Sequence, residues 1–188
     1  MLNKYLQNVE KEFGKLFVVH RIDRGTSGIL CFARNEAAQR HLSLQFQNHE
    51  VKKIYSAIVK GKMKEKKGIV DAPIAENMAR PGSMLIHKRG KNALTLYEVE
   101  EEFKHASFLK IEIKTGRTHQ IRVHLSHRKH PLVADAMYGG AQALGMTRQA
   151  LHAARLAFVH PITQEACVFT APLPDVMAHA WSQLNSDA

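Results

Sequence analysis

The chain has 188 residues, of which 45% are apolar and 23% are charged, and this composition excludes wholesale disorder. Lysine and arginine together number 27 against 17 acidic residues, which gives a formal net charge of +10 and an isoelectric point near 9.8. This excess indicates a polyanionic partner such as nucleic acid, because clustered cations release the counterions of phosphate groups. A general contribution to solubility is the alternative. The length predicts a single domain, residues 1–188, with two small lobes as the other arrangement.

Several protein classes find no support in the sequence. No apolar run approaches the roughly 20 residues that a membrane-spanning helix needs, and residues 1–13 lack the apolar core of a signal peptide. Cys31 and Cys167 stand among apolar neighbours, so we expect buried, reduced thiols of a cytoplasmic protein. The sequence has no GxxxxGK[ST], no GxGxxG after a strand, no HExxH and no CxxC, so nucleotide hydrolysis, dinucleotide redox chemistry and zinc proteolysis are not indicated.

The first third of the chain predicts two short strands and a helix. The apolar runs at residues 15–19 and 29–33 are bounded by turn residues, so both are predicted to be buried strands. Asn35 is a suitable N-cap for a helix that extends to about Asn48. The apolar face of that helix is formed by residues that recur at every fourth position, namely Ala38, Leu42 and Phe46.

The middle of the chain predicts antiparallel strands. Residues 52–61 have the β-branched and aromatic content of a strand, and a basic turn follows them. The segment Ala79–Lys91 is rich in glycine, proline and basic residues, which predicts an exposed, mobile loop. Residues 93–103 and 107–114 alternate apolar with polar side chains, the pattern of half-buried antiparallel strands.

The last third predicts a helix, a strand pair and a second helix. The first helix would be capped by Thr118, with Ile121 and Leu125 four positions apart on one face. Residues 153–161 and 165–172 resemble a strand pair around a turn, and residues 173–184 are helix-like. Together these elements predict a mixed α+β fold with a mainly antiparallel β-sheet core and flanking helices and loops.

One carboxylate stands in an unusual place, in the segment HRIDRGTSG at residues 20–28. Asp23 lies between Arg21 and Arg24, and the nearby positive charge should keep it ionised at neutral pH. An ionised aspartate serves either as a nucleophile or as half of a structural ion pair, and the segment by itself favours the ion pair. The residues that follow, from Thr26 on, fit a tight turn.

Four histidines crowd into twelve residues and raise the question of a metal site: His119, His124, His127 and His130. Their spacing fits no standard zinc set, and no cysteine accompanies them. The neighbouring cations, among them Arg117 and Arg128, would repel a metal ion. We therefore expect no metal, and interpret this stretch as a basic face near phosphate.

Six segments taken together resemble the RluA-type pseudouridine synthases. They occur in the order HRIDRGTSGILCFARN, KKIYSAIVKG, GKNALTLYEV, KTGRTHQIRVHL, HPLVADAMYGG and LHAARLAFVHP. The resemblance runs from about Lys15 to Pro174, and the elements HRxDxxTSG and GRTHQIRVH are long enough to be highly specific. It implies the catalytic domain of that family and the isomerisation of uridine within RNA. In that reaction the N1–C1′ bond breaks, the uracil rotates, and a C5–C1′ bond forms.

The resemblance assigns three residues to catalysis. Asp23 corresponds to the catalytic carboxylate, Tyr55 to the tyrosine of the KxY strand, and Arg122 to the basic residue of HQIR. Arg122 would pair with Asp23, while Tyr55 would stack on the target base and help proton transfer at C5. The isomerisation is redox-neutral and transfers no group, so it implies no cofactor and no metal. The role of Asp23 in attack at C1′, attack at C6 or proton abstraction stays open.

The same resemblance implies contacts to RNA, because a base in structured RNA must be extruded before a side chain reaches it. Arg21 and Arg24 would bind flanking phosphates or fill the space left by the base, with loop-stabilising ion pairs as the alternative. The basic segments Lys60–Lys67 and Arg80–Lys91 would contact the RNA backbone, and Ile121 would pack the pocket wall. The expected RNA-binding residues are Arg21, Arg24, Thr26, Arg117, His119, Gln120 and Ile121.

The chain departs from the family pattern in two places. Members usually carry an extra strand with a Lys-Pro-type motif before the catalytic loop, and many add an upstream S4-like domain. The nineteen residues before His20 show neither. Ala134 also stands in HPLVADAMYGG where glycine is usual, which would restrict a turn.

Three functions are compared. The leading one is a monomeric pseudouridine synthase that acts on ribosomal or transfer RNA. A non-catalytic RNA-binding protein of the same fold is the alternative, motivated by the short N-terminus and the high charge. A glycoside hydrolase is a third class, but its chemistry normally needs two acids that flank the bond, and no second acid is paired with Asp23 in the sequence.

Overall fold

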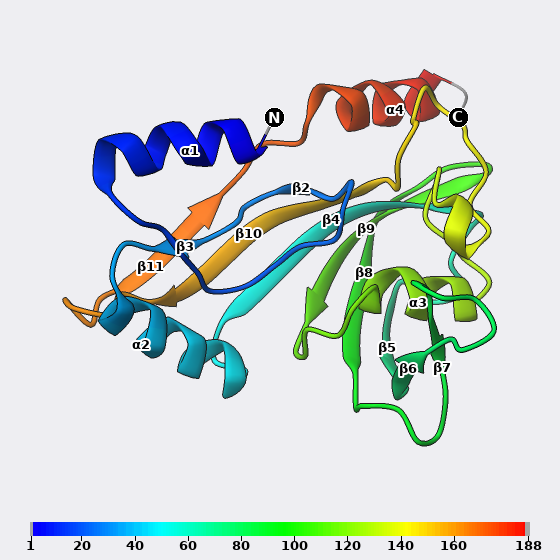
Figure 1. Cartoon of the computed structure of the whole chain (residues 1–188). Coiled ribbons are helices and arrows are strands. Elements are labelled where there is room, and N and C mark those ends of the chain that lie inside the picture. Colours follow the sequence, from blue (N-terminus) through cyan, green and yellow to red (C-terminus); the bar gives the residue numbers. More distant parts are fainter. Residues whose placement is uncertain (1, 187–188) are drawn as a thin grey trace.

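The computed structural model describes residues 2–186, and it has the mixed α+β fold that the sequence predicts (Figure 1). The helices are α1 (Leu2–Phe13), α2 (Glu36–Gln47), α3 (Gln120–His127) and α4 (Asp175–Ser186), with a short 3₁₀ turn at Ala136–Tyr138. The strands are β1 (Phe17–Val18), β2 (Ser27–Gly28), β3 (Phe32–Ala33), β4 (Lys52–Lys60), β5 (Lys67–Asp71), β6 (Ile74–Glu76), β7 (Met84–Ile86), β8 (Leu94–Glu102), β9 (Ala106–Ile113), β10 (Leu151–Val159) and β11 (Ala166–Thr170).

A seven-stranded sheet forms the centre of the fold. Six of its strands follow the order β11-β10-β4-β9-β8-β5, and every neighbouring pair in that series is antiparallel. The remaining strand, β2, pairs with β10 in parallel. Two small antiparallel pairs, β1 with β3 and β6 with β7, lie outside this sheet. The expected strand pairs β8–β9 and β10–β11 are therefore both present.

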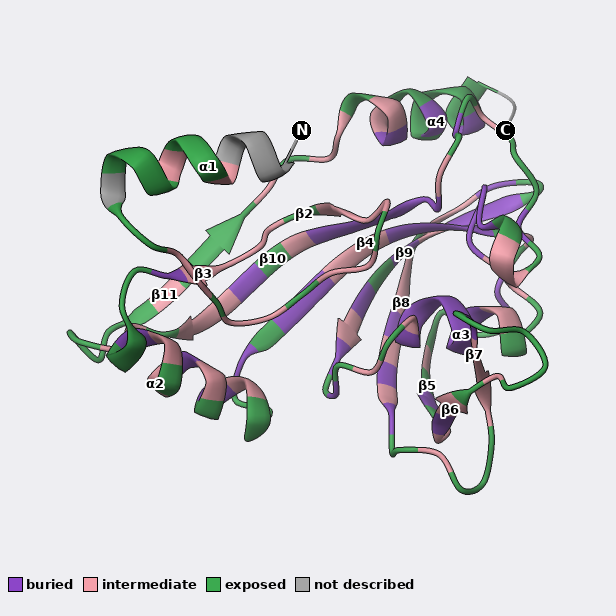
Figure 2. Ribbon diagram, viewed as in Figure 1, coloured by how far each residue is buried: buried purple, intermediate pink, exposed green. Residues whose placement is uncertain are grey.

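The central strand β4 is apolar on both faces because each face is covered. Ala57 and Val59 belong to the core cluster that includes Leu125 of α3, whereas Ile58 belongs to the cluster that includes Met177 of α4. Since successive strand residues point to opposite faces, α3 and α4 cover opposite sides of the sheet. Figure 2 shows the buried stretches of β4, β9 and β10 running through the middle of the molecule.

Helix α2 begins where the sequence predicts. The Asn35 side chain accepts a hydrogen bond from the backbone N–H of Ala38 at 2.8 Å, so Asn35 is the N-cap. The buried face of α2 includes Ala38 and Leu42, which pack with Ala33 of β3. This packing holds α2 beside the segment that carries Asp23.

Three expectations about local structure need correction. The strands β1 and β3 are only two residues long, and Val18 is 61% exposed, because this pair lies outside the main sheet. Cys31 and Cys167 are free thiols but only half-buried. The segment Ala79–Lys91 is not simply a loop, because it contains β7, which pairs with β6.

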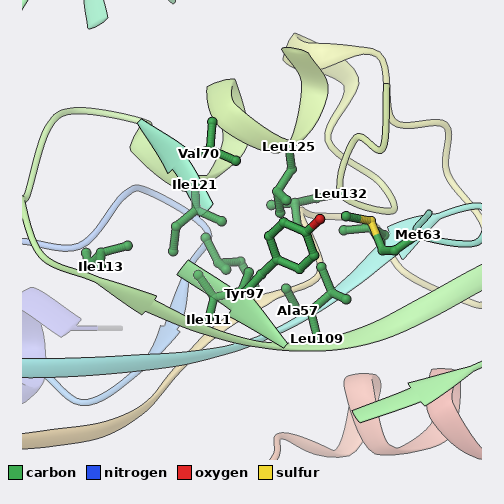
Figure 3. Close-up of a cluster of buried hydrophobic side chains, with 12 residues drawn as sticks. Ala57, Met63, Val70, Tyr97, Leu109, Ile111, Ile113, Ile121, Leu125 and Leu132 are labelled. Carbon is green, nitrogen blue, oxygen red and sulfur yellow. The ribbon is translucent and has the colours of Figure 1, made fainter. Parts of the chain in front are cut away.

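The core beneath α3 contains one polar group in apolar surroundings. Figure 3 shows the hydroxyl of Tyr97 among the side chains of Leu125, Leu132 and Met63. Tyr97 is 4% exposed, and within residues 2–186 its hydroxyl has no hydrogen-bond partner. The ring lies against Gly68 on the neighbouring strand, where a Cβ atom would be 2.4 Å from the hydroxyl oxygen.

No helix within residues 2–186 is long and apolar enough to cross a bilayer.

Candidate active site

The segment that carries Asp23 is docked onto β10 through β2. Ser27 and Gly28 pair with His152 and Ala153, and the Ser27 hydroxyl lies 2.9 Å from Nδ1 of His152. Gly28 has a φ of 109°, and a Cβ atom there would lie 2.2 Å from the carbonyl oxygen of Ala153. A side chain at this position would push the loop off the sheet, so the close approach requires glycine.

Two polar side chains from before β10 hold the backbone of the same loop. Arg148 donates a hydrogen bond to the carbonyl of Gly25 at 2.6 Å, and Gln149 donates one to the carbonyl of Arg24 at 2.8 Å. The Gln149 amide also lies 3.3 Å from the Thr26 hydroxyl. Arg148 and Gln149 lie more than a hundred positions after the loop in the sequence. Their hydrogen bonds make the loop a rigid support for Asp23.

Asp23 faces a pocket between this loop, the sheet and the start of α3. The predicted site residues that line it are Arg21, Asp23, Thr26, Tyr55, Arg117, Gln120 and Ile121. Other lining residues are Ile22, Ile113, Gly116, Thr118 and Leu151. The fold thus brings together residues from four of the six segments that resemble the synthases, and places one carboxylate among arginines and apolar walls.

Arg122 lies behind Asp23 and is held chiefly by another acid. The expected ion pair is present, with Nη1 of Arg122 3.7 Å from Oδ2 of Asp23. The shorter contacts go to Asp135, whose two carboxylate oxygens accept hydrogen bonds from Nε at 2.8 Å and from Nη2 at 2.9 Å. The side chains of Arg122 and Asp135 are 7% and 2% exposed, so this is a buried, bidentate pair. Asp135 therefore orients the guanidinium that faces Asp23.

The turn that presents Asp135 contains the departure from the family pattern. Ala134 has a φ of 59°, in the left-handed region that favours glycine. The turn therefore forms with backbone strain at this alanine, in line with the expected effect of replacing the usual glycine. Gly140 ends the turn at a position where only glycine fits, because a Cβ atom there would be 1.8 Å from the carbonyl oxygen of Leu132. The N–H of Gly140 donates to the carbonyl of Asp135 at 2.8 Å.

Tyr138, at the end of the same turn, completes the support of Arg122. The guanidinium lies 4.9 Å from the centroid of the Tyr138 ring. The Tyr138 hydroxyl accepts a hydrogen bond from the backbone N–H of Met84 at 2.8 Å and lies 2.8 Å from Nδ1 of His119. His119 thus contacts Tyr138, and it is not among the residues that line the pocket.

Tyr55 lies on β4 in the wall of the pocket. Burial raises the pKa of its phenol to about 12, and the negative charge of Asp23 acts in the same direction. The hydroxyl is therefore protonated at neutral pH and can donate a hydrogen bond. The position beside Asp23 suits both stacking on a base and proton transfer.

Gln120 fixes the loop that carries Arg117. Its Oε1 accepts hydrogen bonds from the hydroxyl of Thr115 at 2.7 Å and from the backbone N–H of Arg117 at 3.0 Å. Its Nε2 donates to the carbonyl of Leu94 and to the hydroxyl of Thr95, both at 3.0 Å. The amide oxygen and the amide nitrogen of Gln120 both form hydrogen bonds within the protein, so this side chain is held in place as part of the pocket wall.

The expected cap of α3 is wrong. The helix begins at Gln120, and its N-cap is His119, which has a φ of 55° and makes no side-chain capping bond. Thr118 is exposed and lines the pocket. The chain turns sharply here because the amide of Gln120, and not a threonine hydroxyl, holds the preceding backbone.

The clustered histidines point to different places. His124 is fully buried, with Nε2 3.0 Å from the carbonyl of Ala72 and Nδ1 2.9 Å from the hydroxyl of Thr95. His130 contacts the carbonyl of Lys60, and His127 is exposed. Within residues 2–186 no three His, Cys, Asp or Glu side chains are grouped in a way that could hold a metal ion.

Comparison with known proteins gives the family. The sequence matches the family model described as RNA pseudouridylate synthase over residues 2–127. The chain belongs to the RNA pseudouridylate synthase family. The expected resemblance to its RluA-type members is confirmed by relatives named ribosomal large subunit pseudouridine synthase D.

Individual members of the RNA pseudouridylate synthase family agree with this assignment. An uncharacterized RNA pseudouridine synthase, YlyB of Bacillus subtilis, is 41% identical over 170 residues, which are 90% of this chain and 56% of that protein. Ribosomal large subunit pseudouridine synthase D of Vibrio cholerae is 39% identical over 91% of this chain and 56% of its own length. The chain therefore spans little more than half the length of these relatives.

A solved structure supports the fold of the synthase family. The human protein RNA Pseudouridylate Synthase Domain Containing 1 superposes with a TM-score of 0.79 and is 30% identical. The superposition covers 93% of this chain and 77% of the human one.

The sequence did not point to two residues of the site, Asp135 and Tyr138. Asp135 and Tyr138 lie in HPLVADAMYGG, a segment that carried the family resemblance but to which no role was assigned. The acid that follows the unusual Ala134 was the only local signal. Arg24, in contrast, was expected to bind RNA, but it lies outside the pocket lining. The backbone carbonyl of Arg24 accepts the hydrogen bond from Gln149.

Proposed function

We propose that this protein is an RNA pseudouridine synthase that converts uridine in structured RNA to pseudouridine. One observation carries the proposal: Asp23 faces a pocket walled by Tyr55, with the buried guanidinium of Arg122 3.7 Å behind its carboxylate. Relatives named ribosomal large subunit pseudouridine synthase D favour ribosomal RNA as the substrate, and transfer RNA is the second candidate.

The reaction exchanges one bond to the sugar for another. The N1–C1′ glycosidic bond breaks, the detached uracil rotates, the C5–C1′ bond forms, C5 loses its proton, and N1 gains one. Asp23 supplies the carboxylate that acts at C1′, at C6 or as a base. Atoms and electrons balance without a redox partner, so the residues of the pocket need only to orient the base, stabilise charge and move a proton.

Arg122 keeps Asp23 ionised and oriented while the base occupies the pocket. A base that enters the pocket displaces water, which would favour a neutral carboxyl group. The positive charge of Arg122 opposes that change, and its position is set by Asp135. Arg122 and Asp135 thus act on the reaction through Asp23.

Tyr55 takes two roles in the proposal. Its ring stacks on the uracil, which keeps the detached base in place as it rotates. Its hydroxyl takes part in the proton transfer at C5. Because burial raises its pKa, the phenol is protonated in the resting pocket, so it passes its own proton to N1 or to water as it accepts the one from C5.

The pocket accepts a base only after the base leaves its stack. We propose that Arg21, which lines the pocket and is exposed, contacts the RNA around the extruded uridine together with Arg117. The net charge of +10 would guide the RNA to this face. A single catalytic domain, a monomeric state and a cytoplasmic location complete the proposal.

Release of tritium from RNA labelled with [5-³H]uridine tests the activity, because C5 loses its hydrogen only when the new bond forms. We expect the wild type to release tritium, and Asp23→Asn to be slower by about 10²–10⁴-fold. The matched control is Asp71→Asn, which removes the same charge from an exposed residue of β5 and should react at the wild-type rate.

The same assay separates the alternative function. A non-catalytic RNA-binding protein of this fold would bind the labelled RNA without release of tritium, and Asp23→Asn would bind equally well. Equal release from the wild type and Asp23→Asn would show that Asp23 is not the catalytic carboxylate.

A further inference from the structure

A second hollow lies next to the catalytic pocket. Arg21, Tyr55 and Arg117 line both hollows, together with Ile113 and Gly116, so the two are continuous. The residues that line only the second one come from the loop before Asp23, the end of α2 and the start of β4, namely His20, Phe46, Gln47, His49 and Lys53. An RNA strand that places a base in the first hollow would pass this second one.

Lys53 is the unusual residue of the second hollow. It is 7% exposed, yet within residues 2–186 no carboxylate lies within ion-pair distance of its ammonium group. Glu112 acts on it from farther away, but the Glu112 carboxylate is paired with Lys114. Burial, and then the positive charge of Lys114, lowers the pKa of Lys53. The Lys53 side chain is thus largely buried, while its ammonium group lines the hollow without a carboxylate partner within residues 2–186, which indicates a place that an anion can occupy.

The surroundings of Lys53 have the charge that an anion requires. Among the described residues 2–186, no aspartate or glutamate lines the second hollow, whereas Arg21 and Arg117 do. The Nε of Arg117 donates a hydrogen bond to the carbonyl of Asn92 at 2.9 Å, which fixes the direction of its guanidinium. Two arginines and one lysine therefore line this hollow.

The wall beside Lys53 is a flat aromatic pair. The rings of His20 and Phe46 are stacked with centroids 4.6 Å apart, and the Lys53 ammonium lies 5.7 Å from the Phe46 centroid. Nε2 of His20 accepts a hydrogen bond from the backbone N–H of Cys31 at 3.0 Å. Burial, and then the charge of Lys53, lowers the pKa of His20 to about 4. The ring is thus neutral at pH 7 and carries its proton on Nδ1, which adds a donor beside the ammonium.

We propose that Lys53, with Arg21 and Arg117, binds the backbone phosphate next to the uridine that occupies the catalytic pocket. The spacing fits, because Lys53 and Tyr55 are two positions apart on one face of β4 and hence about 7 Å apart along the strand. The proposal rests on the proposed function, since it takes the catalytic pocket to hold a base. It assigns Lys53 a role in binding, in addition to any role in folding.

The test compares Lys53→Met with Lys104→Met in the full chain. Lys104 is exposed in the turn between β8 and β9, at the far end of the sheet from Lys53, so its variant loses the same charge elsewhere. The probe is a fluorescein-labelled nine-nucleotide single-stranded RNA with one central uridine. The dissociation constant is measured by anisotropy between 50 and 300 mM salt.

We expect Lys53→Met to weaken binding about tenfold at low salt and to reduce the slope of log K against log salt by about 0.7, the value for one phosphate contact. Lys104→Met should change the affinity by less than about twofold. The thermal midpoint of Lys53→Met should equal or exceed that of the wild type, because an unpaired buried charge is removed. A purely structural lysine would instead lower the midpoint. Wild-type affinity and salt slope in Lys53→Met would overturn the proposal.

Neutral phosphates give a second measurement, whose first part uses only the wild-type protein. Replacing each phosphate that flanks the uridine by a methylphosphonate should weaken binding to the wild type at one position, and that position should cost nothing further in Lys53→Met or Lys53→Gln. Additive losses at every position would overturn the assignment. Tritium release from labelled RNA is followed in the same wild-type samples, so a failure of the synthase activity is distinguished from a failure of the phosphate contact.

Discussion

Arg122 donates short hydrogen bonds of 2.8 and 2.9 Å to the two carboxylate oxygens of Asp135 and lies farther, at 3.7 Å, from Asp23. The arginine is thus anchored by one acid and directed at another. A guanidinium held at a single end would sample several rotamers, whereas the bidentate pair fixes its plane. Asp135 is the residue that makes the position of Arg122 independent of the substrate.

Replacing Asp135 with asparagine tests this anchor. We expect the free energy of unfolding to fall by about 3–5 kcal/mol, because the buried guanidinium loses its main counterion. We expect the rate of tritium release to fall by about 10²-fold, since Arg122 would no longer orient Asp23. Urea unfolding and single-turnover release, measured below the thermal midpoint, check the two effects. Asp71→Asn is the control, and a wild-type rate in Asp135→Asn would show that the anchor does not act on catalysis.

The isolated hydroxyl of Tyr97 predicts a stabilising substitution. Tyr97→Phe removes a hydroxyl that has no hydrogen-bond partner within residues 2–186, so the free energy of unfolding should rise by about 1 kcal/mol. Tyr138→Phe is the matched variant, because its hydroxyl contacts Met84 and His119, and it should lower the free energy by about 1–2 kcal/mol. Urea unfolding of both variants checks the difference, and equal shifts would contradict it.

The docking of β2 on β10 predicts that Gly28 tolerates no side chain. In Gly28→Ala the new Cβ would lie 2.2 Å from the carbonyl of Ala153, so the catalytic loop must move. Gly82→Ala is the control, since Gly82 has a φ of 80° but nothing within 4 Å of its Cβ position. We expect the control to lose about 1 kcal/mol through backbone strain alone and Gly28→Ala to lose about 3 kcal/mol or more. Similar losses in both would show that the contact with β10 is unimportant.

Buried histidines predict a loss of stability in acid. The pKa values of His20, His124 and His152 lie below the ordinary value of 6.5, and burial is the largest cause for each. The unfolded chain recovers the ordinary value, so below pH 6.5 it binds more protons than the folded chain. The free energy of unfolding should therefore fall as the pH drops from 6.5, and for His20 this continues to about pH 4.

The structure explains why His124 resists protonation. Its Nε2 faces the carbonyl of Ala72 and carries a proton, so the neutral ring accepts the Thr95 hydroxyl at Nδ1. A second ring proton would oppose that hydroxyl, which already accepts a hydrogen bond from Gln120. Urea unfolding between pH 7 and 5, where most carboxylates stay ionised, measures the effect. His124→Gln should make the dependence shallower, and a flat profile in the wild type would contradict the prediction.

Much of the fold follows from local sequence patterns. Alternation along residues 93–103 and 107–114 predicts β8 and β9, and Asn35 predicts the start of α2, because these signals depend on neighbours in the chain. The cap of α3 was not predictable in this way. It depends on Gln120, whose amide reaches the carbonyl of Leu94 on a strand that is distant in sequence.

For the candidate site, long motifs identify the family and the segments that carry Asp23, Tyr55 and Arg122, because such motifs are specific without knowledge of the fold. The anchoring of Arg122 by Asp135, and the position of Lys53 away from any carboxylate partner within residues 2–186, become visible only in three dimensions. Both facts depend on which charges the fold brings within a few ångströms of one another in a region from which water is excluded. Pairing and desolvation act through space, so the order of residues along the chain does not reveal them.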